Sequence, residues 1–489
     1  MPASTATVSP TDAARLLGQV AVPFVAVGPI ARRRWAMKLL EKNQSDAGVV
    51  RLVADLRKRH GDGPAVVPIP GRTLAIVLTP EDVDRILRTD TASFTAANKE
   101  KVAALSPFQP NGVLISRGDI RAQRRAFNES VLEPEHALHR LAAEWVPVIE
   151  QEAQDLLEHA RSRGELDAPD FVKTWWRLVR RLAFGDAARD DESITDQLWT
   201  LRSNGNWSFA HPLRHRLRDR FTQNLHRHVT AAPSESLAGV VRDLAAPASV
   251  DPIGQMPHWL FAFDAAGMVG ARTLAVLSTH SEQRLRVESE LSGTEAGTPQ
   301  VYEYLRACVL DTTRLWPTTP VILRDSVEET TWSDGAGGAS TIPAGTGFVI
   351  LSSAFHRADD LPFADTFEPE VWLDGRAERY PALVPFSAGP TVCPGRSIVL
   401  FAASTFLATL LRSAEFTVVS DVKPDPRVRC PRRSTISVCV SRCGRAPSAG
   451  AAIPPHYPIG EQFPVIRWRD VTHCLPWFCV QRVRSMVSM

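Results

Sequence analysis

One cysteine lies where a loop leads into an apolar helix, in surroundings that suit a thiolate. The segment Pro-Phe-Ser-Ala-Gly-Pro-Thr-Val-Cys-Pro-Gly-Arg ends at Arg396 and is followed by an apolar run. The free N–H groups and positive dipole end of a helix N-terminus favour the thiolate of Cys393, and Pro394 suits the first helical position. Gly389 permits a sharp turn around the sulfur. A thiolate held among apolar residues can serve as the axial ligand of a haem iron, where its electron donation favours O–O bond cleavage.

The residues around this cysteine form a wider pattern. Phe386, Gly389, Cys393 and Gly395 give Phe-x-x-Gly-x-x-x-Cys-x-Gly, which resembles the haem-binding signature of the cytochrome P450 family of haem-thiolate monooxygenases. The resemblance, to the soluble bacterial type, implies haem b bound through these four residues, with Cys393 as the iron ligand. It also implies a mainly α fold with small β-sheets (α+β) and a long central helix over the haem. The alternative is a buried structural cysteine, the commonest fate of a lone Cys.

Small residues gather within the longest apolar run, which extends from Trp259 to Leu277. Ala266, Gly267, Gly270 and Ala271 share one face of a helix at about 100° per residue, so that this face can lie flat against a macrocycle. Two glycines inside a helix suggest close approach by a ligand or by another backbone. Close packing between two helices is the alternative interpretation.

The same run departs from the family that it resembles. Ala266-Gly267 matches the start of the family's oxygen-groove motif, where an acid and then a threonine usually follow, but this chain has Val269 and Gly270. Thr273 lies on the face of Gly270, about 4.5 Å further along the axis. It could hold a water molecule, or it could be a core threonine bonded to its own backbone. Ala266, Gly267, Gly270 and Thr273 are therefore the candidate catalytic residues.

Two charges also interrupt this apolar run. Asp264 and Arg272 would be costly to bury alone, so we expect each to have a partner or to reach water. A structural ion pair is the expected role of both, and the alternative for Asp264 is a proton-relay carboxylate.

A pair of opposite charges follows in the next helical segment. Asp311 and Arg314, three residues apart and followed by Leu-Trp-Pro317, resemble the Glu-x-x-Arg helix of the family and its proline exit. Residues at this spacing are neighbours on a helix and can pair. The resemblance implies that they support the haem ligand. Val371 stands where the family has a further arginine, and Arg376 is a possible replacement.

Two haem carboxylates would need cationic partners, and guanidinium groups match a carboxylate with two donors. Arg124 and Arg125 lie in a segment resembling the one where the family places a Trp or His and an Arg, although neither Trp nor His is present. Arg324 matches a strand arginine with the same role. Thr391 stands where the family often has Arg or His. For any one of these arginines, a solvated surface position is the alternative.

The remaining elements are predicted from local pattern. Residues 65–78 indicate two strands around Pro70-Gly71, followed by a helix capped by Thr79. Residues 135–185 have a helical pattern that Gly185 ends. Strands are expected near 319–324 and 347–351 on either side of a Gly-rich turn at 334–338, which lacks the spacing and the lysine of a phosphate loop.

Composition indicates an ordinary globular protein of 489 residues, with 44% hydrophobic and 22% charged residues. The net charge of +2 gives no general attraction to nucleic acid, and the arginines at 32–34 are interpreted as solvated surface or partner contacts. The apolar stretch from Leu16 to Ala31 is shorter than the roughly 20 residues that span a bilayer. We therefore expect a soluble, cytoplasmic monomer with no membrane or nucleic-acid partner.

No linker divides most of the chain, so we expect an N-terminal segment (1–50), one haem domain (51–445) and an unassigned tail (446–489). The tail is rich in Pro, Trp, Cys and basic residues, and it could be a disordered extension, a partner-binding tail or an aberrant terminus. A metal site formed by Cys439, Cys443, His473 and Cys474 is a weaker possibility, because its spacing is unspecific.

The leading functional hypothesis comes from the resemblance. It is a monooxygenase that inserts one oxygen atom from O₂ into a small apolar substrate, using two electrons from a ferredoxin or flavodoxin and its reductase. The chain has no flavin or nicotinamide motif of its own. Val269 and Gly270 also favour a peroxide-driven or non-oxygenating haem-thiolate enzyme, and a non-catalytic haem or ligand-binding protein is the third hypothesis.

Overall fold

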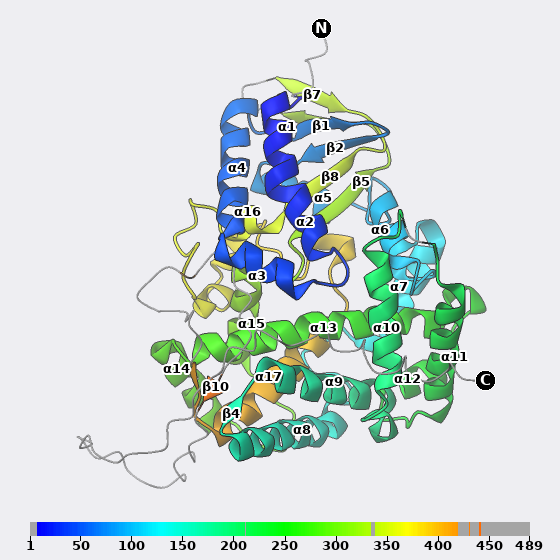
Figure 1. Cartoon of the computed structure of the whole chain (residues 1–489), viewed down its shortest axis with the longest axis vertical. Helices are drawn as coiled ribbons and strands as arrows, with labels where there is room; N and C mark the ends of the chain where they lie inside the picture. The colour runs from blue at the N-terminus through cyan, green and yellow to red at the C-terminus, as the bar shows by residue number, and fades with distance from the viewer. Residues whose placement is uncertain (1–6, 211, 334–337, 419–429, 431–439, 442–489) are drawn as a thin grey trace, which may run out of the picture.

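Strands and helices occupy two regions of the computed structural model, which describes residues 7–210, 212–333, 338–418, 430 and 440–441 (Figure 1). The strands are β1 (Ala65–Ile69), β2 (Arg72–Ile76), β3 (Phe94–Thr95), β4 (Glu165–Leu166), β5 (Val321–Ser326), β6 (Thr330–Ser333), β7 (Ala339–Ile342), β8 (Gly347–Leu351), β9 (Thr417–Val418) and β10 (Val440–Ser441). The helices are α1 (Pro10–Leu16), α2 (Val22–Val27), α3 (Arg34–Lys42), α4 (Ser45–His60), α5 (Pro80–Arg88), α6 (Lys99–Leu105), α7 (Gly118–Leu132), α8 (Ala142–Arg163), α9 (Ala168–Phe184), α10 (Glu192–Gly205), α11 (His215–Ala231), α12 (Leu237–Asp243), α13 (Pro252–Leu277), α14 (Ser281–Ser292), α15 (Glu303–Leu315), α16 (Ser352–His356) and α17 (Arg396–Ser413). The expected mainly α fold with small sheets is confirmed.

The largest sheet has the strand order β1-β2-β8-β5-β3. Its first hairpin turns at Gly71, whose φ of 75° suits glycine, and the hydroxyl of Thr79 accepts the N–H of Asp82 at 3.2 Å to cap α5. Both features match the sequence prediction. β5 and β8 pair antiparallel as neighbours, so the segments predicted near 319–324 and 347–351 lie side by side. β6 and β7 also pair antiparallel, on either side of the predicted turn.

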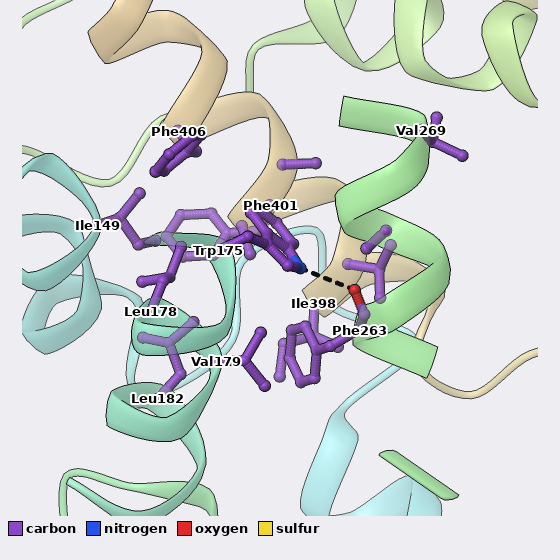
Figure 2. Close-up of a cluster of buried hydrophobic side chains, with 14 of the residues drawn as sticks. Ile149, Trp175, Leu178, Val179, Leu182, Phe263, Val269, Ile398, Phe401 and Phe406 are labelled. Atoms are coloured by element: carbon purple, nitrogen blue, oxygen red, sulfur yellow. Dashed lines mark hydrogen bonds between the residues drawn. The ribbon is translucent and has the colours of Figure 1, made fainter. Parts of the chain in front are cut away.

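The helical region is organised around α13, which packs against α9, α15 and α17. Figure 2 shows the apolar interior between α9, α13 and α17, where the rings of Trp175 and Phe406 meet edge to face at 5.6 Å. The stretch predicted to be helical, 135–185, contains α8 and α9, with β4 between them. Gly164, with a φ of 76°, ends α8 in a left-handed conformation that few other residues adopt. Gly185 ends α9 as predicted.

The N-terminal residues pack onto this body. Val8 N–H donates to Val66 O at 2.9 Å, and the expected boundary at residue 50 falls inside α4 (Ser45–His60). The division into segment, domain and tail stays a prediction, because residues 446–489 lie outside the described part of the chain, as do the cysteines and histidine of the weaker metal hypothesis. No cluster of three or more His, Cys, Asp or Glu residues suited to a metal occurs among the described residues.

Two described helices are apolar and long enough to cross a membrane by length and composition alone, Ala248–Leu277 and Arg396–Ser413. In their most apolar windows, 72% and 78% of the residues are buried inside the protein. Both helices therefore contribute to the protein core.

Candidate functional site

Cys393 and one face of α13 line the same cavity, which has a volume of about 2040 Å³. Among the residues of α13 that line the cavity are Phe261, Ala262, Ala265, Met268, Val269 and Arg272. Phe386, from the cysteine loop, lines it as well. Most of these side chains are apolar, so the cavity suits a large apolar group lying between a sulfur and a helix.

The cysteine loop is a tight structure stabilised by backbone contacts. Cys393 N–H donates to Phe386 O at 2.9 Å, and Gly389 has a φ of 61°. A Cβ on Gly389 would lie 2.2 Å from Leu87 O, so the loop needs glycine both to turn and to pack against the end of α5. Gly395 precedes α17 as its N-cap. Pro394 therefore lies outside the helix, not at its first position as predicted.

The surroundings of Cys393 do not make its thiol acidic by themselves. Burial raises its pKa, while the Gly395 N–H and the positive charges of Arg125 and Arg396 act in the opposite direction, and burial prevails. The backbone N–H at the start of the helix thus favours the thiolate, as expected, but burial outweighs it. A metal ion deprotonates a thiol that binds it, so the residue remains suited to a metal.

Three arginines surround the cysteine loop and line the cavity: Arg121, Arg125 and Arg324. Arg125 donates to Val392 O at 2.6 Å and Arg121 to Pro390 O at 2.9 Å. Arg324 donates to the hydroxyls of Thr391, at 2.5 Å, and Ser387, at 3.2 Å. Burial and the charge of Arg121 lower the pKa of Arg324 to about 10, so it remains a cation at neutral pH.

Arg124, the other predicted cation, lies elsewhere. Its guanidinium donates to the Ser116 hydroxyl at 2.7 Å and to Val250 O at 3.3 Å, and it does not line the cavity. The sequence prediction named Arg124 beside Arg125, whereas the structure places Arg121 beside the cysteine loop. Residues four apart share a helix face, so the spacing of Arg121 and Arg125 was the available signal.

The two glycines of α13 pack against another helix, although Gly267 also lines the cavity together with Ala266 and Ala271. A Cβ on Gly267 would lie 2.5 Å from the ring of Trp175 in α9, and one on Gly270 would lie 3.7 Å from Phe171. Figure 2 shows the indole of Trp175 directed at α13, with Val269 on the side of the helix away from it. Ala266 and Gly267 border the cavity, whereas Gly270 does not line it. The helix-packing alternative is therefore correct for both glycines.

Thr273 belongs to the core. Its hydroxyl donates to Val269 O at 2.9 Å and lies 3.1 Å from the Thr312 hydroxyl, and it does not line the cavity. The prediction of a catalytic role for Thr273 is therefore wrong, and the alternative of a back-bonded core threonine is correct.

The two charges on α13 have partners. Asp264 pairs with Arg202 at 2.7 Å, as expected for a structural ion pair. Arg272 donates to Trp316 O at 3.2 Å. Both side chains border the cavity. The carboxylate of Asp264 is engaged by Arg202, which favours the structural role over that of a proton relay.

Asp311 and Arg314 form the expected ion pair, with Nε–Oδ1 and Nη2–Oδ2 distances of 2.6 and 3.1 Å and no exposed side-chain surface. Asp311 also accepts Glu368 N–H at 2.8 Å and the Trp372 indole N–H at 3.2 Å. The indole of Trp372 thus provides an outer donor to Asp311, where the sequence has Val371 and no further arginine. Arg376 pairs with Glu368 and Asp374 and so does not replace a missing arginine. Asp311 and Arg314 do not line the cavity, so they support its wall.

Polar groups that sequence reasoning missed lie at another part of the cavity. Lys101 and His258 line it, from α6 and α13. Arg32, predicted to be solvated surface or a partner contact, also lines it and donates to the Met268 sulfur at 3.2 Å. These positions depend on how distant segments meet, so local pattern gave no signal.

A sequence model of cytochrome P450 matches residues 29–230 and 292–436, which together make up more than half of the chain. The chain belongs to the cytochrome P450 family. The cysteine loop lies in the second matched part, whereas α13 lies in the stretch that the family model does not match.

Curated relatives match over part of their length. Cytochrome P450 4c3 of Drosophila melanogaster is 32% identical over 159 residues, covering 30% of this chain and 29% of that protein. Cytochrome P450 52A13 of Debaryomyces hansenii is 34% identical and covers 25% of each. Cyclooctat-9-en-7-ol 5-monooxygenase of Streptomyces melanosporofaciens is 31% identical, covering 29% of this chain and 32% of that protein. The chain thus matches about a third or less of their length, and relatives from fly, yeast and Streptomyces do not support a specifically bacterial type.

Solved structures show the same fold over most of the chain. A cyanobacterial cytochrome P450 with retinoic acid bound has a TM-score of 0.64 at 17% identity, covering 79% of this chain and 93% of that one. The haem domain of another cytochrome P450 has a TM-score of 0.66 at 15% identity, covering 84% and 94%. The cytochrome P450 fold is thereby established.

The residues around the cavity fit the haem that this family carries on a cysteine thiolate. Cys393 lines an apolar space beside three arginines. Arg125 pairs with Glu129, whereas Arg121 and Arg324 have no ion pair with a carboxylate among the described residues. Haem carboxylates would supply the missing anions.

Proposed function

We propose that this protein is a haem-thiolate monooxygenase, which inserts one oxygen atom from O₂ into an apolar organic substrate with two external electrons. The observation that carries the proposal is the position of Cys393, across an apolar cavity from α13 and beside Arg121, Arg125 and Arg324. Family membership and the name of the Streptomyces relative, a monooxygenase, support it. The retinoic acid in the cyanobacterial structure supports an apolar substrate.

Each residue has a distinct part in this proposal. Cys393 provides the iron ligand, and the three arginines hold the haem carboxylates. Thr391 contributes by fixing Arg324 with its hydroxyl. Asp311 and Arg314 keep the wall behind the cysteine loop in place. When bound, a thiolate-ligated haem supplies the activation of dioxygen, because thiolate donation favours O–O cleavage.

A second candidate is peroxide-driven oxidation. The five residues from Ala265 to Val269 include no acid and no alcohol, Asp264 is paired with Arg202 and Thr273 is turned into the core. Dioxygen reduction requires protons at the site, whereas hydrogen peroxide already carries the electrons and protons that O₂ would need. The cavity face of α13 therefore suits oxidation by hydrogen peroxide at least as well as oxidation by O₂.

We further propose the form of the cofactor, the electron donor and the cellular location. They are haem b as the form of the cofactor, a ferredoxin or flavodoxin as electron donor, and a cytoplasmic monomer of the soluble bacterial type without membrane or nucleic-acid partner. The burial of both apolar helices inside the protein supports the cytoplasmic assignment. The absence of a flavin or nicotinamide motif from the sequence supports an external donor.

The absorption difference that carbon monoxide produces in the reduced protein tests the central claim. A thiolate ligand shifts the main band strongly to longer wavelength, and Cys393→Ser should abolish this band. Cys308→Ala is the matched control, since Cys308 is a core cysteine of α15 that does not line the cavity. Lack of haem, or an unshifted band in the unaltered protein, would refute the proposal. Product formation with reductant and O₂, compared with peroxide alone, then separates the two candidate reactions.

A further inference from the structure

Asp264 has one carboxylate oxygen with a protein partner and one without. It lines the cavity from α13, and 21% of its side chain is exposed. Its Oδ2 accepts a hydrogen bond from Arg202 Nη2 at 2.7 Å. Within the described ranges, no hydrogen bond or ion pair involves Oδ1, and this atom is not buried. The cavity therefore contains a charged acceptor that no neighbouring protein group satisfies.

Arg202 fixes the orientation of this carboxylate and links α10 to α13 (Figure 1). Its guanidinium lies 4.4 Å from the ring centroid of Phe261 and 5.5 Å from that of Trp199. The nitrogen that binds Asp264 also donates to Ile30 O at 3.0 Å. Only 3% of the arginine side chain is exposed. Arg202 is therefore held from several sides, so that Oδ2 of Asp264 keeps its partner and Oδ1 stays available.

The charges near Asp264 favour a neutral partner for Oδ1. Asp264, Met268 and Arg272 are four residues apart, so they follow one face of α13, and all three line the cavity. Arg32 donates to the Met268 sulfur at 3.2 Å. With Arg202, three guanidinium groups thus lie near one carboxylate, and they would repel a cationic ligand. An ionised acid has no proton to donate to Oδ1. A hydroxyl group donates a hydrogen bond without adding charge.

The position of Asp264 suits a substrate contact and not a haem contact. Asp264 directly precedes Ala265 and Ala266, which also line the cavity that α13 shares with Cys393. Consecutive helical residues are about 1.5 Å apart along the axis, so the carboxylate lies at the level of these alanines. An ionised haem carboxylate would be repelled by Asp264. A ligand bound to Oδ1 therefore occupies the space between α13 and Cys393.

We propose that Asp264 binds a hydroxyl group of the substrate, whose hydrogen bond it accepts on Oδ1 while Arg202 holds Oδ2. The inference rests on the proposed function and specifies its substrate class, a neutral and mostly apolar alcohol. Asp264 contacts the substrate, whereas Arg202 acts as a positioning residue. The bound hydroxyl fixes one end of the molecule against α13, so that its apolar part extends toward Cys393.

Equilibrium dialysis of the full, haem-loaded chain tests this inference with two isomers, decanol and methyl nonyl ether. Both probes consist of the same atoms, but only the alcohol donates a hydrogen bond. In Asp264→Asn, the amide oxygen can accept from Arg202, which leaves the amide N–H groups toward the cavity. This variant should bind decanol roughly 10- to 100-fold more weakly, as expected for a lost hydrogen bond to a charged group, and should bind the ether as before.

Two further variants make the comparison decisive. Asp196 of α10 is another carboxylate that lines the cavity, so Asp196→Asn is the matched control and should leave the affinities for both probes unchanged. The double variant Asp264→Leu, Arg202→Met removes both charges together and leaves neither one buried alone. It should lose affinity for decanol relative to the ether, and it answers the question if Asp264→Asn does not fold.

Three outcomes would overturn the inference. One is unchanged decanol binding by Asp264→Asn, and another is an equal loss for alcohol and ether, which would indicate only a structural role. The third is a selective loss of decanol binding in Asp196→Asn, which would place the hydroxyl elsewhere. Haem content and the carbon monoxide band are measured on the same samples. If those fail, the proposed function fails, whereas the ratio of alcohol to ether affinity still decides the role of Asp264.

Discussion

The indole N–H of Trp175 donates to the carbonyl oxygen of Phe263 at 2.8 Å, linking α9 directly to the backbone of α13 (Figure 2). This approach is possible because residue 267, four positions after Phe263, has no side chain. The ring occupies the space of a Cβ at Gly267. The contact sets the rotation of α13 and hence the residues that α13 presents to the cavity.

Gly267→Ala should therefore destabilise the protein, whereas Gly270→Ala should not. At position 267 the new methyl group would lie 2.5 Å from the indole, and overpacking of this kind costs about 1–3 kcal/mol. At position 270 the nearest atom is at 3.7 Å, so the better helix propensity of alanine should add up to about 1 kcal/mol. Urea denaturation followed by circular dichroism measures both. Equal behaviour of the two variants would contradict the packing explanation.

Asp311→Ala should destabilise the protein by about 3–5 kcal/mol, because it leaves the guanidinium of Arg314 buried without its carboxylate. The indole of Trp372 and Glu368 N–H would lose their acceptor as well. The same denaturation experiment checks this, with Asp374→Asn as control. Asp374 pairs with Arg376 at the surface, so its replacement should leave the midpoint unchanged. A small effect of Asp311→Ala would mean that the buried pair is dispensable.

Local features were predictable from sequence because neighbouring residues determine them. The hairpin around Gly71, the Thr79 cap and the turn at Gly389 each depend on the conformational preferences of a few adjacent residues. The pair Asp311 and Arg314 was predictable for the same reason, since one helical turn brings them together.

The orientation of α13 could not be predicted, because its sequence is apolar on nearly every side. An amphipathic helix indicates its buried face, but α13 has small or apolar residues toward both α9 and the cavity. Only the position of Trp175 decides between them. The choice between Arg121 and Arg124 likewise depends on the rotation of α7, and the site of Lys101 depends on the packing of α6 against β5.

Arg125→Met should accelerate haem loss, whereas Arg124→Met should not. Arg125 lines the cavity beside the cysteine loop, while Arg124 contacts Ser116 and Val250 outside it. Loss of a charge-assisted hydrogen bond typically corresponds to about a 10- to 100-fold change in rate or affinity. Haem transfer to excess apomyoglobin, followed by absorbance, gives the rates. Faster loss from Arg124→Met than from Arg125→Met would reverse the assignment made from the structure.

His356 should make the protein less stable as the pH falls below about 6.5. Burial, together with the charge of Arg314, lowers the pKa of His356 in the folded state to about 3, and its Nε2 accepts Val384 N–H at 3.1 Å. The unfolded chain therefore binds a proton near the usual pKa of about 6.5, while the folded chain does not. At pH 5 this difference corresponds to about 2 kcal/mol of lost stability, and the loss continues toward pH 3. His356→Asn retains an acceptor without this proton, so denaturation at pH 7 and pH 5 should show about 2 kcal/mol less loss for the variant. Replacement of the exposed His136 by Asn is the control and should leave the pH dependence of stability unchanged. If His356→Asn showed the same pH dependence as the unaltered protein, other groups would cause the acid sensitivity.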